Sequence, residues 1–378
     1  MDLQHSADVA FMQIALREAL KGVGFTHPNP AVGAVVVANG EVVGKGFHPR
    51  CGEPHAEAIA LEQAGEHARG ATIYVTLEPC CHHGRQGPCT EKILGAGIRR
   101  VVYAMRDPYH EVDGRGGQQL RAAGLEVLEG IGEARALGIN EAWLSFVKTG
   151  RPFVTLKMSM SLDGRVCAAD GTSRWVTSGP AQRQGHRLRA MSDAILVGVQ
   201  TVITDDPLLT VRLGGIRSDA SPIRIVLDSR LRIPVQAQVL RPDLPAATWV
   251  VTTGKPGRDL IRVVRGTRHE ILTVPEFQGS VDLAALMEEL ARRNVIHLLV
   301  EGGPKVWTSF LRERRVDRLV AFLAPCLIGA GSLEEDPGRA VGRIGIETIS
   351  QVSRLGQATW RRVGPDMMCT GRVDSRAP

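Results

Sequence analysis

The feature that most constrains the fold is an alternation of strand-like and helix-like segments over the first 147 residues. Apolar runs predict strands, and apolar residues at helical spacing predict helices. The Asn39-Gly40 turn predicts that the first two strands form a hairpin. Together these segments predict an α/β domain with a mixed sheet. The expected strands are 31–37, 41–47, 71–78, 99–105 and 125–130, and the expected helices are 6–22, 54–68, 90–97, 114–124 and 132–147.

A second α/β pattern follows a break at KTGRP, residues 148–152, where Gly and Pro interrupt the alternation. We therefore expect one domain over 1–147 and another over 152–378. The expected strands of the second domain are 153–160, 193–198, 223–228, 247–253, 269–274, 295–303 and 317–325, with helices at 178–191, 283–293 and after the Gly-Gly-Pro at 302–304.

Charge differs between the two halves. Residues 1–150 hold 14 Lys+Arg and 17 Asp+Glu, a net charge of −3, and the rest of the chain has a net charge of +9. A basic half suits phosphate-bearing ligands or nucleic acid, although scattered surface arginines explain it equally well. Aromatic residues are only 4%, and no basic stripe is interleaved with Phe or Tyr, which argues against nucleic acid.

The chain shows no membrane or export signal. Its longest apolar run, 31–38, is too short to span a bilayer, and the N-terminus lacks a basic region before an apolar stretch. We therefore expect a cytoplasmic protein. Seven cysteines in that setting indicate a metal or catalytic role rather than a disulfide framework.

One group of residues has the composition of a zinc site. His55 and Glu57 begin a predicted helix, Cys80 follows a predicted strand, and Cys89 precedes the next helix. One imidazole and two thiolates form a three-ligand zinc site whose fourth position is open to water. Zinc makes that water a hydroxide nucleophile near neutral pH. Glu57 can take the proton of the water and pass it to a leaving amine.

His-x-Glu followed by Pro-Cys is typical of nucleobase zinc deaminases, although here residues 81–88 separate the two cysteines. A structural zinc held by Cys80, Cys81, Cys89 and a histidine is the alternative. Because Cys81 is adjacent to Cys80, we expect its side chain to point elsewhere. We do not assign it as a ligand.

Longer motifs place the chain in a family. It closely resembles the bifunctional deaminase–reductases of bacterial riboflavin biosynthesis over almost its whole length. The first half carries THPNPAVGAVVV, GFHPRCGEPHAE, VTLEPCCHHGRQGPC and MRDP, and the second carries LKMSMSLDGRV, SRWVTS, TVITDDPLLTVR, IRIVLDS and VEGGPKV.

The resemblance implies a cytidine-deaminase-like three-layer domain followed by a dihydrofolate-reductase-like domain. The first would remove the ring amine of a diamino-hydroxy-phosphoribosylamino-pyrimidine, and the second would use NADPH to reduce the ribose to a ribityl chain. The expected partner is this small phosphoribosylated pyrimidine, with no nucleic acid or membrane, and we expect a homo-oligomer.

The resemblance also assigns residues. It implies that His55, Cys80 and Cys89 bind zinc and that Glu57 transfers protons. Asn29 and His48 would contact the pyrimidine or its ribose phosphate, although Asn29 between two prolines also suits a turn. NADPH is assigned to Ser159, Trp175, Thr201, Asp205, Ser229, Gly303, Pro304, Lys305, Val306 and Trp307, and substrate to Ser173, Arg189, Leu209, Arg212 and Glu301.

Three positions need separate comment. We hypothesise that Lys157 orients or protonates the opened ribose, and we count it with the substrate residues. Cys81 stands where the family usually has Ser, and Ser159 stands where relatives often have Gly.

The second half lacks a Gly-x-Gly-x-x-Gly after a strand, so a Rossmann fingerprint is absent. Gly302-Gly303-Pro304 before a helix would let the backbone approach a phosphate, although such a turn is often purely structural. Three other functions stay open. They are a nucleic-acid deaminase with an accessory domain, a binding module with structural zinc, and a deaminase whose reductase half only binds ligand.

Overall fold

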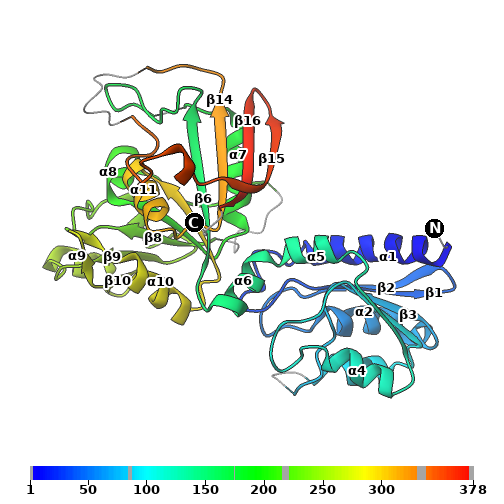
Figure 1. Ribbon diagram of the computed structural model, residues 1–378. Helices are drawn as coiled ribbons and strands as arrows, with labels where there is room; N and C mark the ends of the chain where they lie inside the picture. The colour runs from blue at the N-terminus through cyan, green and yellow to red at the C-terminus, as the bar shows by residue number, and fades with distance from the viewer. Residues whose placement is uncertain (1–2, 84–86, 174, 215–220, 330–337, 374–378) are drawn as a thin grey trace. The chain divides into compact units, whose positions relative to one another are not determined.

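The computed structural model describes residues 3–83, 87–173, 175–214, 221–329 and 338–373. The chain divides into two compact units, Met1–Gly150 and Arg151–Pro378, called the N-terminal and C-terminal units below (Figure 1). Within the described residues no helix is long and apolar enough to cross a membrane.

The N-terminal unit contains a five-stranded sheet in the order β2-β1-β3-β4-β5. β1 is antiparallel to β2 and β3, and β3, β4 and β5 are parallel, so the predicted mixed sheet is confirmed. Asn39 and Gly40 both have positive φ, 52° and 80°, as a tight hairpin turn requires. The strands are β1 (Gly33–Ala38), β2 (Glu41–Phe47), β3 (Thr72–Val75), β4 (Arg100–Tyr103) and β5 (Glu126–Glu129).

Helices cover both faces of this sheet, which confirms the three-layer prediction. Figure 1 shows α1 and α5 on one face and α2 and α4 on the other. A Cβ on Gly33 would lie 2.1 Å from the carbonyl oxygen of Ala15, so the absence of a side chain lets α1 pack directly on β1. The helices are α1 (Leu3–Ala19), α2 (Ala56–Ala64), α3 (Cys89–Gly95), α4 (Arg115–Ala122), α5 (Glu133–Ile139) and α6 (Glu141–Thr149), with a 3₁₀ turn η1 (Gly65–Ala68).

The single helix predicted over 132–147 is wrong. The segment forms two helices, α5 and α6, that meet at Asn140, where φ is −103° and ψ is 18°. Apolar residues keep helical spacing across the break, so the pattern alone gives no sign of it.

A buried ion pair fastens α1 to the sheet. Asp8 and Arg100 are only 1% and 6% exposed. Arg100 donates two hydrogen bonds to the Asp8 carboxylate, at 2.7 and 2.9 Å, and the Tyr74 hydroxyl donates a third at 2.7 Å. Burial raises the pKa of Asp8, but the hydrogen bonds from Arg100 and Tyr74 outweigh it and lower the pKa overall.

We expect Asp8→Asn to lower the free energy of unfolding of this unit by about 3–5 kcal/mol, because the buried Arg100 charge loses its buried carboxylate partner and keeps only the exposed Glu126. The native pKa is lowered, so the pair stabilises the fold above the unfolded-state pKa of Asp8 and loses its effect as the pH falls through the native value. Denaturant unfolding at two pH values checks both statements. Glu126→Gln is the matched control, because Glu126 also binds Arg100 but its side chain is 62% exposed. An equal loss of unfolding free energy in Asp8→Asn and Glu126→Gln would contradict the expectation.

The C-terminal unit contains a nine-stranded sheet in the order β10-β9-β8-β7-β13-β6-β14-β16-β15. The first seven strands in this order are parallel to one another. The last two are not: β16 is antiparallel to β14, and β15 is antiparallel to β16. The strands are β6 (Phe153–Ser161), β7 (Ala194–Gly198), β8 (Ile223–Leu227), β9 (Thr248–Thr252), β10 (Glu270–Thr273), β13 (His297–Gly302), β14 (Arg318–Ala324), β15 (Leu355–Val363) and β16 (Asp366–Val373), with a small pair β11 (Glu276–Phe277) and β12 (Ser280–Val281).

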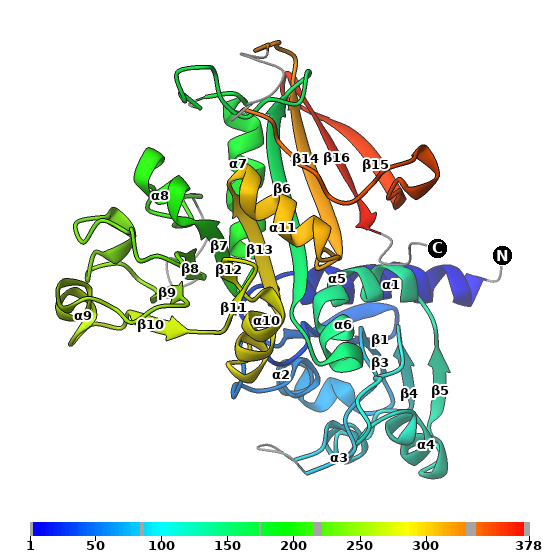
Figure 2. The same cartoon turned by 60° about the vertical axis from the view of Figure 1, so that its left-hand side comes forward.

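Helices again lie on both faces of this sheet. Residues of α10 and α11 share one apolar core with β6 and β13, and residues of α7, α8 and α9 pack on the opposite face. Figure 2 shows α11 in front of the central strands and α7 behind them. The helices are α7 (Gly179–Ala190), α8 (Val199–Asp205), α9 (Arg258–Val264), α10 (Leu283–Arg292) and α11 (Pro304–Arg312), with 3₁₀ turns η2 (Gln238–Leu240) and η3 (Ile349–Gln351).

Candidate active sites

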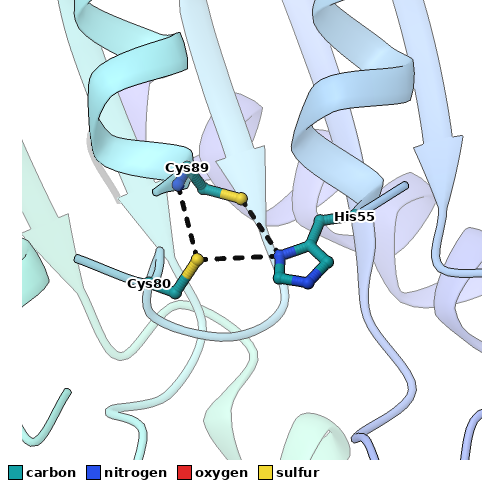
Figure 3. A group of neighbouring side chains, drawn as sticks. All are labelled: His55, Cys80 and Cys89. Carbon is teal, nitrogen blue, oxygen red and sulfur yellow. Dashed lines mark hydrogen bonds between the residues drawn. The ribbon is translucent and has the colours of Figure 1, made fainter. Parts of the chain in front are cut away.

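The three residues predicted to bind zinc lie together. The Nδ1 atom of His55 and the Sγ atoms of Cys80 and Cys89 are all within 4.8 Å of one another. His55 Nδ1 is 3.6 Å from the sulfur of Cys80 and 3.3 Å from that of Cys89, and Figure 3 shows the three side chains converging. Two soft thiolates and one imidazole are a donor set that zinc prefers, so these residues fit the ion.

Three separate elements bring these ligands together. His55 is the N-cap residue of α2, with extended backbone, and Cys89 is the first residue of α3. Cys80 lies in the segment that follows β3, and its sulfur accepts the backbone N–H of Cys89 at 3.4 Å. The start of α3 therefore stabilises negative charge on Cys80.

The charges of the two cysteines are linked. Without a metal, a hydrogen bond from the Cys89 thiol lowers the pKa of Cys80 to about 4, and the same hydrogen bond raises the pKa of Cys89 well above its usual value. One thiolate is therefore already stable at neutral pH, which is the state that binds metal.

Glu57 is the second residue of α2 and is 4% exposed. Burial raises the pKa of its carboxyl group, so the group holds a proton more readily than an exposed glutamate does. Together with His55 and Cys80 it lines a cavity of about 480 Å³, called the first cavity below.

Asn29 and His48 line the same cavity and touch each other. Asn29 Nδ2 is 3.1 Å from His48 Nε2, and His48 Nδ1 is 3.1 Å from the carbonyl oxygen of Pro54. A carbonyl oxygen only accepts, so Nδ1 carries the proton and Nε2 accepts from the Asn29 amide. Burial lowers the pKa of His48, which agrees with a neutral ring.

Cys81 and His83, one of the two histidines of the loop, make their contacts outside the cluster. The Cys81 thiol donates to the carbonyl oxygen of Glu111 at 3.7 Å, and His83 pairs with Glu91 at 3.3 Å. Neither belongs to the metal-binding group found among the described residues, as expected for Cys81. The Cys80-Cys81-Cys89 alternative therefore lacks support from the geometry.

Glu78 also lines the first cavity and organises the backbone around it. Its carboxylate accepts the backbone N–H groups of Asp107, Gly114 and Gly117, at 3.2, 2.9 and 2.9 Å. Gly114 is the N-cap of α4 and has no capping side chain, so Glu78 supplies the missing acceptor. This holds Asp107 on the cavity wall, where burial raises its pKa to about 7.

The C-terminal unit contains a second cavity, of about 1080 Å³. It lies where β6, β7, β8 and β13 end, which is the usual binding edge of a parallel sheet. All sixteen residues predicted to bind cofactor or substrate in this half line it. They are Lys157, Ser159, Ser173, Trp175, Arg189, Thr201, Asp205, Leu209, Arg212, Ser229, Glu301, Gly303, Pro304, Lys305, Val306 and Trp307.

A buried ionic group lies on this second cavity. Arg189 donates to Glu301 from Nε and Nη2, at 2.8 and 2.6 Å, and from Nη1 to the carbonyl oxygen of Thr210 at 3.0 Å. The Arg189 guanidinium thus makes a bidentate pair with Glu301. The two side chains are only 15% and 7% exposed, so most of this ion pair is shielded from solvent.

The charged residues of this group and their burial shift one another's pKa values. Burial would raise the pKa of Glu301, but the Arg189 charge lowers it to about 2. Burial lowers the pKa of Lys157. His186 accepts the backbone N–H of Arg212 through Nδ1 at 3.2 Å, and burial and the two arginines lower its pKa to about 4. The group therefore combines a neutral imidazole with a net positive charge.

The second cavity also fits a dinucleotide. Gly303 has a φ of 83°, a conformation that favours glycine, and it is the N-cap of α11. A Cβ on Gly302 would lie 2.8 Å from the side chain of Val197, so the absence of a side chain lets β13 lie close against β7 at the cavity. No side chain in the part of the chain that the structure describes caps the start of α11, whose first backbone N–H groups suit an anion. The buried Nε1 of Trp307 has no hydrogen-bond partner within the described parts of the chain. These features suit the phosphates and polar edge of NADPH.

Sequence reasoning left out four residues that shape the sites. Glu78 and Asp107 belong to the motifs VTLEPC and MRDP, so the signal was present but not used. His186 lies one helical turn before Arg189, a spacing that places both on one face of α7. Asn140 gives no signal in the sequence.

Comparisons with known proteins agree with both sites. Residues 5–105 match the cytidine and deoxycytidylate deaminase zinc-binding region, and residues 152–369 match the RibD C-terminal domain. The riboflavin biosynthesis protein RibD of Aquifex aeolicus is 41% identical, covering 96% of this chain and 97% of its own. The RibD of Escherichia coli is 40% identical, covering 95% and 98%.

Solved structures agree as well. A RibD of Acinetobacter baumannii has a TM-score of 0.85 and 34% identity, covering 98% of this chain and 99% of its own. A diaminohydroxyphosphoribosylaminopyrimidine deaminase/5-amino-6-(5-phosphoribosylamino)uracil reductase of Thermotoga maritima has a TM-score of 0.84 and 32% identity, with the same coverage.

The fold and the two sites thus define a two-domain enzyme with a zinc-type deaminase half and a reductase half that uses NADPH. Its substrates are small molecules. The chain belongs to the RibD family of bifunctional riboflavin biosynthesis enzymes.

Proposed function

We propose that this enzyme deaminates 2,5-diamino-6-(5-phosphoribosylamino)pyrimidin-4-one and then reduces the ribose of 5-amino-6-(5-phosphoribosylamino)uracil with NADPH. Residues 1–147 would carry the first reaction and 152–378 the second. The observation that supports this best is the His55, Cys80 and Cys89 cluster beside a buried Glu57, on a cavity separate from the one in the second half. The names of the Thermotoga maritima relative state both reactions.

In the deaminase half, His55, Cys80 and Cys89 would hold zinc. Bound zinc supplies Lewis-acid chemistry that makes water a nucleophile near neutral pH. The Glu57 carboxylate would take a proton from the attacking water and give it to the leaving amine, because it is buried on the cavity wall beside the ligands. Asn29 and His48 would orient the pyrimidine.

In the reductase half, the turn from Gly303 to Trp307 would hold NADPH with Ser159, Trp175, Thr201, Asp205 and Ser229. NADPH supplies a hydride. Ser173, Arg189, Leu209, Arg212 and Glu301 would hold the phosphoribosyl group, with Glu301 fixing the Arg189 guanidinium rather than leaving it free for the phosphate. Lys157 would orient or protonate the opened ribose.

The finer statements on partners and location stay predictions of the sequence. They are a homo-oligomer, no nucleic-acid ligand and a cytoplasmic location.

The test is a coupled assay with the complete chain. We expect wild type to release ammonia from the diaminopyrimidine and then to oxidise NADPH, followed by absorbance at the nicotinamide band. A tRNA and a single-stranded DNA oligonucleotide are offered as competing substrates. Ammonia from either of these but not from the pyrimidine would replace the proposal with nucleic-acid deamination. Ammonia without NADPH oxidation would leave a deaminase with a reductase half that only binds ligand.

A further inference from the structure

Asn140 uses its side chain in an unusual way for its position. It ends α5 and is the N-cap of α6, where Asn usually accepts a hydrogen bond from the first turn of the helix. Its side chain makes no such bond to α6. Instead Oδ1 accepts the N–H of Ala31 at 2.8 Å, and Nδ2 donates to the carbonyl oxygen of Ala31 at 3.0 Å. Asn140 is 4% exposed, so both bonds are shielded from water.

Ala31 lies at the centre of the segment that carries a pyrimidine-binding candidate. Asn29, two residues earlier, bonds the His48 ring at 3.1 Å. Val32, one residue later, accepts the backbone N–H of His48 at 2.9 Å. The segment 29–32 thus binds the ring of His48 through Asn29 and the backbone of His48 through Val32. Asn140 binds Ala31, which lies between these two residues.

The start of α6 also reaches the cavity directly. Trp143, three residues after Asn140, lines the first cavity together with Asn29 and His48 and is 5% exposed. Residues three apart lie on one face of a helix. The start of α6 therefore supports the wall of the first cavity in two ways. The Trp143 side chain lines the cavity, and the Asn140 side chain binds the backbone of Ala31.

We propose that Asn140 is a positioning residue for the deaminase reaction, which fixes segment 29–32 so that Asn29 and His48 meet the pyrimidine ring. This inference rests on the proposed function of the first cavity. The Asn29 Nδ2 atom is used by His48, which leaves its Oδ1 atom to accept from a ring or amino N–H of the substrate. A shift of the segment would move this acceptor while the zinc ligands and Glu57, on other elements, stay in place.

The decisive experiment compares Asn140→Leu and Asn140→Asp with wild type in the complete chain. Leu is similar in size and bonds neither group of Ala31, and Asp cannot donate to the Ala31 carbonyl. Each buried group left unpaired disfavours the native arrangement of segment 29–32 by about 10-fold against an arrangement in which water pairs it, and substrate binding must reverse that shift. We expect KM for the diaminopyrimidine to rise by about 10-fold to 100-fold, with kcat, zinc content and reduction of supplied deaminated substrate close to wild type.

Ala136→Gly is the matched control, because it loosens α5, the helix that Asn140 ends, and leaves both hydrogen bonds between Asn140 and Ala31 possible. An equal rise in KM in this control, or a fall in kcat and zinc content with KM unchanged in the Asn140 variants, would overturn the proposal. Hydrogen exchange of the 27–33 backbone adds a readout that needs no substrate. Faster exchange in the Asn140 variants alone supports the positioning role. Unchanged exchange contradicts it, even if the proposed substrate is wrong.

Discussion

Replacing Glu57 with Gln is expected to lower ammonia release from the diaminopyrimidine by at least about 100-fold. Gln has almost the same shape and keeps the cavity filled, but its amide neither takes a proton from water nor gives one to an amine at neutral pH. Because Glu57 is 4% exposed, bulk water has poor access to replace it as the proton carrier. Ammonia release measured at saturating substrate tests the change in kcat.

The two halves of the chain provide the control for this experiment. The Glu57→Gln variant should oxidise NADPH at the wild-type rate when it is given the deaminated pyrimidine, since the second cavity lies in the other unit. Glu53→Gln is a matched variant, because Glu53 lines the same cavity but is exposed and bonds no ligand of the cluster. If Glu57→Gln deaminates as fast as Glu53→Gln, Glu57 does not carry the proton.

Most elements could be predicted because each apolar run matches one strand or one helix face. The strand β2 fills its expected range, β1 ends one residue beyond its own, and the hairpin turn lies at Asn39-Gly40 as expected. The prediction failed where tertiary contacts decide the outcome. Helical spacing runs through Asn140, but the pairing of its side chain with Ala31 belongs to the folded unit and has no trace in local sequence.

The antiparallel strands β15 and β16 were not predicted, for a different reason. Most side chains of β15 are exposed, so its sequence, LGQATWRRV, lacks the alternation of a half-buried strand. It is a strand because β16 pairs with it along most of its length. Pairing of backbone groups alone leaves little pattern in the side chains.

The zinc-type cluster could be predicted because its chemistry requires particular residue types at short spacing, as in His-Ala-Glu and Pro-Cys. The second cavity could not be derived in this way. Arg189 and Glu301 lie far apart in the sequence, and only the fold shows that they bind each other with two hydrogen bonds. The resemblance named both residues, but it did not reveal that they form a pair.

The largest effect in the reductase half is expected for Lys157→Met. Reduction adds a hydride to carbon and needs a proton on the neighbouring heteroatom, and a proton donor contributes about 10²–10⁴-fold to such a step. Lys157 lines the second cavity beside Glu301 and Arg189, whose charges offset each other. The Lys157 ammonium is therefore, with Arg212, an unbalanced positive charge of this group. We expect NADPH oxidation with the deaminated substrate to fall by at least about 100-fold, with ammonia release unchanged.

Lys157→Arg separates the two roles proposed for this residue. Arginine keeps the positive charge but does not release a proton at accessible pH. If Lys157 only orients the ribose, the Arg variant keeps most of the activity. If it donates the proton, the Arg variant is as slow as the Met variant.

The pKa of Lys157 is lowered by burial, so the donor form is lost as the pH rises, at a pH below the ordinary lysine value. Reduction by wild type should then fall in that alkaline range while NADPH binding persists. A flat pH profile together with an active Arg variant would leave orientation as the role of Lys157, and full activity in Lys157→Met would remove both roles.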